Sequence, residues 1–457
     1  MAIKWLIDAS YFVAAILFIL GLKGMSSPVS ARKGIVWAGV GMVLATVVTF
    51  LTPGMGNMLL MVIAIGLGGV LAWVSGKRVA MTDMPQMVAI YNGMGGGAAA
   101  AIAAVEFARG EMHGTVVTLL ATLGALIGAV SFSGSVVAWA KLQGVMNKAF
   151  RLPAQNAVNV VLALVTVGFG AAIVIAPQVD PMLVGAFFVL ALVLGAVITL
   201  PIGGADMPVV ISLFNAFTGL AVGFEGFVMG IPALIIAGIV VGAAGTLLTQ
   251  LMAKAMNRPI SNILFVPMAA AGGGEAVEGE QKEVGAMDAA AMMRYASKVI
   301  IVPGYGMAVA GAQHKVWEMS ELLEEAGVEV VFAIHPVAGR MPGHMNVLLA
   351  EAGVPYEKIL DLEEINADFA QADVALVIGA NDVVNPSART DKSSPIYGMP
   401  ILNADMAQNV IVVKRGKGTG YSGIENALFY KDNTRLLYGS AQQAIGEVIQ
   451  HVKAMSV

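Results

Sequence analysis

One short segment in the last part of the chain concentrates the groups that bind phosphate. Residues 414–421 read KRGKGTGY, with three cations and three glycines in eight positions. Cationic side chains and open backbone N–H groups are what a phosphate cradle needs. A solvated basic turn would have the same composition, but this segment lies in an acidic part of the chain. We therefore expect it to bind the 2′-phosphate that distinguishes NADP(H) from NAD(H).

A second phosphate-type motif follows the β-branched run at residues 298–302. Gly304 and Gly306, with Ala310 after them, form a relaxed version of the dinucleotide fingerprint, in which backbone N–H groups approach a pyrophosphate at a helix start. Many strand-to-helix turns hold two glycines, so the glycines alone are weak evidence for a dinucleotide site. The strand before them and the helix after them strengthen the interpretation. An acidic residue that would clasp the ribose of NAD is missing, because His335 stands at the end of the next strand.

Two further loops at expected strand ends complete a candidate nucleotide site. The loop at residues 337–344 combines flexible backbone with one cation, Arg340, and we interpret its His344 as a packed loop histidine. The other loop leaves the strand that ends at Ile378 and reads GANDV over residues 379–383. Since the carboxyl ends of parallel strands meet at one edge of a sheet, these loops and the cations are expected to converge there.

A helix entrance occurs twice in the apolar part of the chain. The pattern D-M-P-x5-aromatic-N-x3-G begins at Asp83 and again at Asp206, so that Asn92 and Asn215 take matching positions. Asp and Pro are ordinary residues at a helix start, and a buried Asn commonly bonds a neighbouring helix. Two amides at the same depth in a membrane also favour a hydrated polar pathway, and both interpretations stay open.

Groups for other chemistries are scarce. The chain has no cysteine, which excludes disulfides, thiolate nucleophiles and cysteine-held metals, and its five histidines show no metal-ligand spacing. We expect neither a metal nor a flavin. The net charge of −4 argues against nucleic acid as a partner.

Composition divides the chain into two parts. It is 58% hydrophobic and only 12% charged; the part up to Arg258 holds 12 Lys/Arg and 7 Asp/Glu, whereas the remainder holds 14 and 23. A bilayer core needs about 20 apolar residues per helix. The sequence predicts nine such spans: 5–22, 34–52, 57–76, 84–108, 115–140, 157–177, 182–200, 207–228 and 231–253.

The basic residues predict an orientation. On the side reached after the first span lie Lys23, Arg32, Lys33, Lys77, Arg78, Lys141, Lys148, Arg151, Lys254 and Arg258, against Lys4 and Arg109 on the other. Because cytosolic loops carry the excess of Lys and Arg, the amino terminus is expected outside and everything after Arg258 in the cytosol.

The part after the spans predicts an α/β domain. We expect a transmembrane domain at 1–258, a flexible linker at 259–290 and a nucleotide-binding domain at 291–457. Strands alternating with helices indicate a doubly wound parallel sheet of Rossmann type. The expected strands are 298–302, 328–334, 373–378, 409–413 and 435–438, and the expected helices are 307–326, 345–351, 362–370 and 441–455.

Several long phrases together resemble the β subunit of the proton-translocating NAD(P) transhydrogenase. The resemblance covers nearly the whole chain, and the soluble motifs are highly specific. The matching phrases are GYGMAVA (304–310), HPVAGRMPGHMNVLLAEA (335–352), VIGANDVVNP (377–386), VVKRGKGTGY (412–421), IGGADMPVV (202–210) and SGSVVA (133–138).

The resemblance implies a translocase in which hydride passes directly from NADH to NADP+ while protons flow inward. NADP(H) would bind this chain and NAD(H) a companion α subunit, or α subunits, that adds membrane helices. It also implies a bacterial inner membrane and a dimer of αβ units. Hydride transfer is the chemistry of the cofactors, so no nucleophile or general base is required, and none is visible.

The resemblance also implies site residues. Lys414 and Arg415 would hold the 2′-phosphate, Gly420 and Tyr421 would close over the nucleotide, and Asp382 would be the catalytic carboxylate that senses its redox state. The implied proton pathway is Asn92, Ser135, Asp206 and Asn215. The implied cofactor-binding residues are Gly304, Tyr305, Gly306, Ala310, Val337, Ala338, Gly339, Arg340, Met341, Pro342, Gly343, Gly379, Ala380, Asn381, Asp382, Val383, Lys414, Arg415, Gly420 and Tyr421.

One position departs from the better-known members, which have a histidine where Asn92 stands. An amide cannot titrate, so the proton carrier must be a histidine of the companion subunit, a water chain, or Glu106 or Glu225. The latter two, near the far ends of their helices, could equally be interfacial carboxylates. Two other functions would also use a membrane part and a nucleotide domain: a nucleotide-gated ion transporter or channel, and a self-sufficient membrane dehydrogenase, for which no acid–base residue is found.

Overall fold

The computed structural model describes residues 2–110, 114–146, 150–176, 180–265, 279–341, 343–416, 420 and 422–455. The chain folds into two compact units. One comprises residues 1–202 and 210–249, and the other residues 203–209 and 250–457. The first holds the long apolar helices and the second a sheet with its covering helices.

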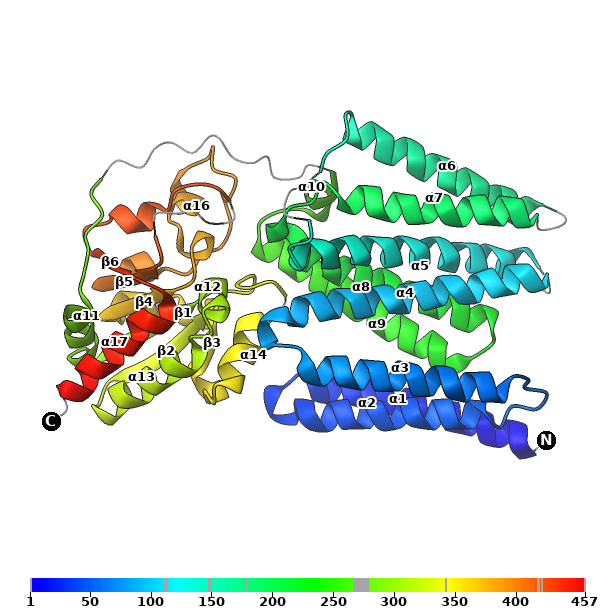
Figure 1. The fold of residues 1–457 in the computed structure, drawn as a ribbon, viewed down its shortest axis with the longest axis horizontal. Coiled ribbons are helices and arrows are strands. Elements are labelled where there is room, and N and C mark those ends of the chain that lie inside the picture. The colour runs from blue at the N-terminus through cyan, green and yellow to red at the C-terminus, as the bar shows by residue number, and fades with distance from the viewer. Residues whose placement is uncertain are drawn as a thin grey trace. The chain divides into compact units, whose positions relative to one another are not determined.

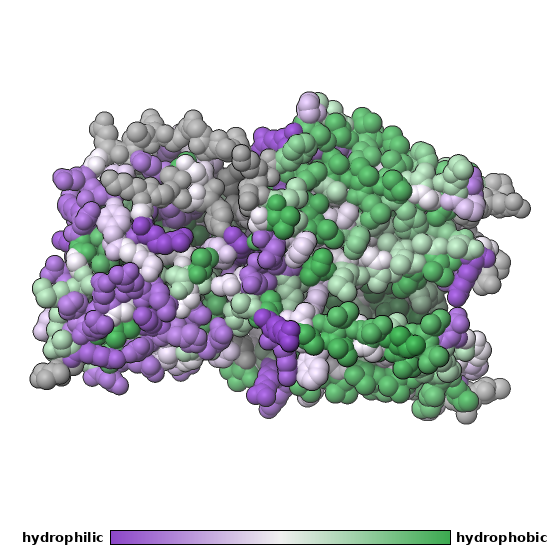
Figure 2. Space-filling view, viewed as in Figure 1, coloured by the Kyte–Doolittle hydropathy of each residue, from purple (hydrophilic) through white to green (hydrophobic). Residues whose placement is uncertain are grey.

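Nine described helices are long and apolar enough to cross a membrane. Each corresponds to one of the nine predicted spans, with ends that differ by a few residues. Figure 1 shows them running side by side, and Figure 2 shows that their visible surface is mainly hydrophobic. They are α1 Ala2–Met25, α2 Pro28–Thr49, α3 Met58–Arg78, α4 Met84–Arg109, α5 Thr115–Leu142, α6 Gln155–Ile175, α7 Pro181–Thr199, α8 Met207–Val228 and α9 Pro232–Ala255.

Glycine allows the closest approach between helices α8 and α9. A Cβ on Gly238 of α9 would lie 2.3 Å from the backbone nitrogen of Gly223 on α8, and one on Gly219 of α8 would lie 2.5 Å from the nitrogen of Gly242. No side chain fits between backbones at that distance. The glycines that are dense in these spans therefore permit backbone contact, as expected for helices packed in a membrane.

The second unit contains a six-stranded parallel sheet with the order β3-β2-β1-β4-β5-β6. This is a Rossmann-like doubly wound arrangement, in which the strand order reverses between β1 and β4. The strands are β1 Lys298–Pro303, β2 Glu329–Ile334, β3 Ile359–Asp361, β4 Val374–Ile378, β5 Asn409–Lys414 and β6 Thr434–Tyr438. Five of them were predicted.

Both faces of the sheet are covered, which explains why its strands read as continuous apolar runs. The helices on one face include α13 Gln313–Glu325, which contacts β2, and α17 Ala441–Ala454, which contacts β5 and α11 Ala286–Arg294. The other face carries a core around Ile300, Val377 and Phe369. The remaining helices are α10 Ile260–Phe265, α12 Tyr305–Val309, α14 His344–Glu351, α15 Leu362–Ile365 and α16 Ser387–Thr390.

The chain just before α11 joins the edge of this sheet. Leu436 of β6 accepts a backbone hydrogen bond from Val284 (3.0 Å) and donates one to Lys282 (2.8 Å), in a parallel bridge centred on Glu283. Residues 282–284 therefore extend the sheet beyond β6.

Candidate functional site

The loops after β1 and β4 meet at the point where the strand order reverses. The Gly304 N–H donates to Ile378 O (2.9 Å) and the Gly306 N–H donates to Gly379 O (3.0 Å). Gly379 has a φ of +73°, and a Cβ on Gly304 would lie 2.3 Å from Gly379 O. These glycines are thus required by the contact between two backbones, and the N–H groups of Gly304 and Gly306 are used within the protein.

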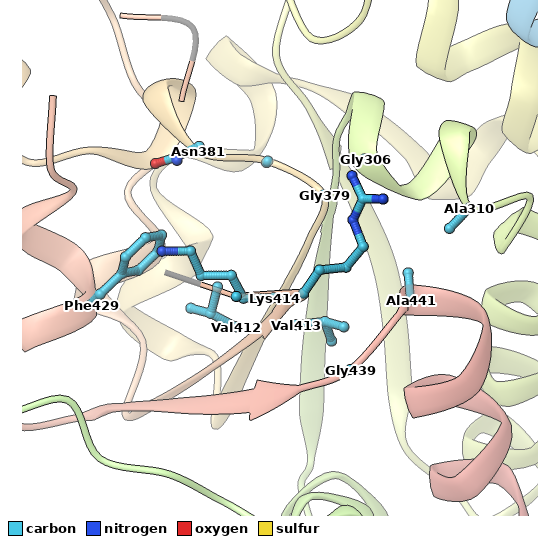
Figure 3. A pocket seen from close by; sticks show the side chains of 13 residues that line it. Gly306, Ala310, Gly379, Asn381, Val412, Val413, Lys414, Phe429, Gly439 and Ala441 are labelled. Carbon is cyan, nitrogen blue, oxygen red and sulfur yellow. The ribbon is translucent and has the colours of Figure 1, made fainter. Parts of the chain in front are cut away.

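A cavity of about 400 Å³ opens at the carboxyl ends of β1, β4 and β5 (Figure 3). Gly306 and Ala310 come from the first loop, and Gly379, Ala380 and Asn381 from the second. Its remaining lining residues are Val412, Val413, Lys414, Arg415, Gly416, Phe429, Gly439 and Ala441.

The cations of this cavity leave β5 side by side. The ammonium nitrogen of Lys414 lies 4.3 Å from the centre of the Phe429 ring, toward which the side chain extends in Figure 3. Burial lowers the pKa of Lys414, and the charge of Glu425 opposes that shift. Within the described part of the chain neither Lys414 nor Arg415 forms an ion pair. Both charges can therefore be offered to an anion.

A second cavity lies beside the first, and Arg415 lines both. The Arg340 guanidinium stacks over the Tyr305 ring at 4.3 Å, and the Arg340 N–H donates to His344 Nδ1 (3.1 Å). His344 is buried, as expected of a packed histidine. Lining residues of this cavity from the α/β domain are Gly304, Tyr305, Gly306, Val337, Ala338, Gly339, Arg340, Gly379, Ala380, Asn381, Asp382, Val383, Ile396, Met399, Arg415, Gly420 and Ser422.

Asp382 ties the loop after β4 to the segment that follows the cations. Ser422 donates to it twice, from its N–H to Oδ2 (3.0 Å) and from its hydroxyl to Oδ1 (2.6 Å). Gly420 packs so closely that a Cβ there would lie 2.4 Å from Oδ1. Next to Asp382, Asn426 donates to both Asn381 oxygens (2.9 Å each). The carboxylate therefore closes one side of the second cavity.

Most residues that the sequence assigned to nucleotide binding line one or both cavities. Met341 and Gly343 line neither, while Pro342 and Tyr421 lie outside the described residues. Sequence reasoning missed Ser422 and Asn426, whose bonds to the loop after β4 join segments about 40 residues apart. It also missed Gly439, although its place after β6 could have indicated it, since that loop lies at the same edge of the sheet.

In the helical unit, α4, α5 and α8 share a polar cluster. Asn92 donates from its side-chain nitrogen to the Ser135 hydroxyl (3.0 Å), and its backbone carbonyl accepts from the Thr218 hydroxyl (3.4 Å). Ser131 bonds the Thr218 hydroxyl (2.6 Å) and the carbonyl of Phe214 (2.9 Å). The structure therefore brings Asn92 and Ser135 together and adds Ser131 and Thr218, which the sequence analysis did not single out.

The other two residues of the implied proton pathway are not part of this cluster. Asn215 forms no side-chain hydrogen bond within the described part of the chain, although it lies one turn from Thr218. Asp206, directly before α8, is almost fully buried and receives two 2.7 Å hydrogen bonds from Arg258. Burial raises the pKa of Asp206, and the charge and hydrogen bonds of Arg258 oppose that shift.

The fold and the two cavities define a class of protein: a multi-pass membrane protein with a Rossmann-like domain whose crevice lies where dinucleotides bind in such folds. Among the described residues there is no group of three or more His, Asp or Glu side chains that could hold a metal ion.

Comparison with known proteins identifies the family within this class. The model of the NAD(P) transhydrogenase beta subunit matches residues 7–451, so the chain belongs to that family. The NAD(P) transhydrogenase subunit beta of Rhodospirillum rubrum is 47% identical over 458 residues, which are 97% of this chain and 98% of the relative. A sequence from a named strain of that species gives the same values.

Proposed function

We propose that this chain is the NADP(H)-binding, proton-conducting subunit of a transhydrogenase that passes hydride directly from NADH to NADP+, coupled to inward proton movement. NAD(H) would bind a companion α subunit with further membrane helices, in a dimer of αβ units. The domains would be 1–258 for the membrane, 259–290 for a linker whose residues 282–284 already pair with the sheet and whose residues 286–290 belong to α11, and 291–457 for NADP(H). We place the complex in a bacterial inner membrane, with the amino terminus outside and the α/β domain in the cytosol.

The observation that carries this proposal is the pair of cations beside a crevice that has no acidic residue at the end of β2. Lys414 and Arg415 make no ion pair among the described residues, and the end of β2 carries His335 where an NAD-type domain has a ribose-clasping carboxylate. Cations favour a nucleotide with one more phosphate, and a carboxylate there would repel it. The donor set therefore fits NADP(H) better than NAD(H).

NADP(H) supplies the hydride chemistry, and the residues of this chain bind the nucleotide and control its release. Lys414 and Arg415 would bind the 2′-phosphate, with Ala310 near the pyrophosphate. Asp382 would lie on the nicotinamide side, where its bonds to Ser422 hold the following segment against the crevice. Opening that contact would let the nucleotide leave, and keeping it closed would exclude water.

Coupling between proton movement and hydride transfer requires that the membrane helices influence the affinity of the α/β domain for NADP(H). Asn92 and Ser135 belong to a bonded polar cluster, and Asp206 forms an ion pair with Arg258 at the start of α8. We propose that a proton passing along α4, α5 and α8 changes the Asp206 contact and so the affinity for NADP(H).

The test is nucleotide binding by the isolated α/β domain. Because residues 282–284 pair with β6, the fragment should begin at Glu280. We expect calorimetry to show tight binding of NADPH and negligible binding of NADH. Equal affinity for both nucleotides would overturn the assignment of the cations to the 2′-phosphate.

A further inference from the structure

Glu225 is a carboxylate that the fold buries in the helical unit without a partner. It lies in the last turn of α8 and is 1% exposed. Neither of its oxygens has a hydrogen-bond partner among the described residues. Burying an unpaired carboxylate is expensive, and an apolar side chain would pack there at no such cost. Packing therefore does not explain this residue.

The neighbouring helix makes room for the carboxyl group. A Cβ on Gly124 of α5 would lie 2.2 Å from Glu225 Oε1, so the carboxyl group occupies the space that any other residue at position 124 would need. On either side of Gly124, Ala121 and Ala125 are fully buried in an apolar cluster. The glycine thus forms a recess in an otherwise apolar wall, and the acid fills it.

Among the described residues, few charged groups lie on the helices that surround Glu225. Glu106, near the end of α4, acts on it electrostatically and is itself 3.5 Å from Arg109. The sole charged residues of α5 and α9 are Lys141 and Lys254, in the last turns of those helices. Since Lys141 is 17 positions after Gly124, it lies about 25 Å along α5 from the recess. Glu111 and His113, between α4 and α5, lie outside the described residues.

Glu225 also lies on the face of α8 that carries the Thr218 hydroxyl. Phe214, Thr218 and Glu225 are spaced by four and seven residues, so they share one face of the helix. Opposite them on α5 stand Gly134, Ser131 and Gly124 in the reverse order. The carboxyl group is thus about 10 Å along the helix from the Thr218 hydroxyl, a span that a few water molecules can bridge.

The geometry points to Glu225 as the proton-binding site at the end of the pathway where α4 and α8 terminate. This inference rests on the proposed function. The carboxylate takes a proton from a hydronium ion at that end, which leaves water, and becomes a carboxylic acid. Its O–H bond breaks again when the proton passes to water beside Thr218, and no electron is transferred. Asn92, which cannot titrate, then needs only to hold the cluster in place.

The test uses the complete complex with its α subunit in sealed vesicles. NADH and NADP+ start the reaction, a pH-sensitive dye reports proton movement, and NADPH binding is measured on the same preparation. We expect Glu225→Gln to lower proton movement by about a hundredfold, the scale of a lost proton-transfer group, while NADPH binding is unchanged. Glu225→Asp, which restores an acid, should recover most of the rate, with a shifted pH profile.

Two further variants separate a proton-binding role from a packing role. Thr166→Val removes another buried polar group, on α6, and should leave the rate unchanged. Gly124→Ala keeps the acid but displaces it, so proton movement should fall; this variant decides the matter if Glu225→Gln does not accumulate.

The inference and the function fail in different ways. A wild-type rate of proton movement in Glu225→Gln overturns the inference. If Glu225→Gln does not accumulate, a wild-type rate in Gly124→Ala overturns it instead. So does equal loss in the Gln and Asp variants with NADPH binding intact. No proton movement in the wild-type complex contradicts the proposed function itself.

Discussion

Lys414 and Arg415 leave the same strand but meet different surroundings. Lys414 is half-buried against the Phe429 ring, which fixes its ammonium group and partly desolvates it. Arg415 is exposed and lines both cavities. A planar guanidinium can form two parallel bonds to a phosphate, whereas an ammonium acts as a point charge. Arg415 should therefore contribute more of the selectivity for NADPH.

We expect Arg415→Ala to weaken NADPH binding to the fragment from Glu280 by about 1.5–3 kcal/mol, the range for a hydrogen bond to a charged group. Calorimetry on both proteins at the same ionic strength measures this loss of binding free energy. Lys392→Ala removes an exposed cation elsewhere and should have no effect, which controls for net charge. A loss of NADH affinity as large as the loss for NADPH would show that Arg415 does not read the 2′-phosphate.

His335 should make the stability of the α/β domain depend on pH. Its Nε2–H donates to Pro400 O (2.7 Å) while Nδ1 accepts from the Val337 N–H (3.2 Å), so both ring nitrogens are used by the neutral form. Burial lowers its pKa from 6.5 to about 4, and the bond to Pro400 opposes that shift. Between about pH 6.5 and 4, His335 is therefore neutral in the native state but protonated in the unfolded chain.

The sign follows from that difference. Stability is fully present above the unfolded pKa and is lost as pH falls from about 6.5 to about 4, by about 3 kcal/mol in total. Urea unfolding of the fragment at several pH values measures the loss. His335→Gln should be less stable near pH 7 but should lack this contribution. An unchanged pH dependence in that variant would exclude His335 as its source.

At the scale of elements, the loop after β4 depends on one glycine. Gly379 has a φ of +73°, and a Cβ there would lie 2.1 Å from Met307 N. We expect Gly379→Ala to destabilise the fragment by about 2–4 kcal/mol through backbone strain and overpacking. Gly285→Ala, with its nearest neighbour at 3.9 Å, should cost little. If thermal unfolding shows equal stability for the two variants, the close contact does not constrain the fold.

The elements that the sequence predicted are those with long apolar runs. The nine spans and five strands belong to this group, because the spans are apolar along their length and the strands are largely buried in the sheet. Strand β3 was missed, since it has three residues and none of them is fully buried. The single helix expected over 307–326 is two helices, α12 and α13, because Gly311 takes a φ of +61° between them. Glycine is also tolerated inside helices, so its presence in the sequence did not by itself predict the break.

Some features of the candidate site could likewise be predicted from the sequence, and others could not. Loops that follow strands could be predicted, since topology alone brings them to one edge of the sheet. The bonds of Ser422 to Asp382 and the stacking of Phe429 on Lys414 could not, because they join segments whose separation in sequence carries no periodic signal. Likewise the polar cluster of Asn92 with Ser135, Ser131 and Thr218 depends on the packing of α4, α5 and α8.

For the whole molecule, the proposed function predicts that a proton gradient sets the direction of the reaction. In vesicles that hold the complete complex with the NADP(H) domain facing outward, acidifying the interior should raise the rate of NADP+ reduction by NADH. Dissipating the gradient with a proton carrier should remove that increase. A rate that does not change with the gradient would contradict coupling, but it would not contradict the proposed binding of NADP(H).

The three residues that continue the sheet beyond β6 have a consequence for handling the protein. Lys282 and Val284 occupy backbone groups of Leu436 that would otherwise stand open at the last strand. An open strand edge is a template on which another chain can pair, and aggregation starts in that way. A protease cut after residue 284 would therefore produce a domain with an intact core and crevice that self-associates as it concentrates.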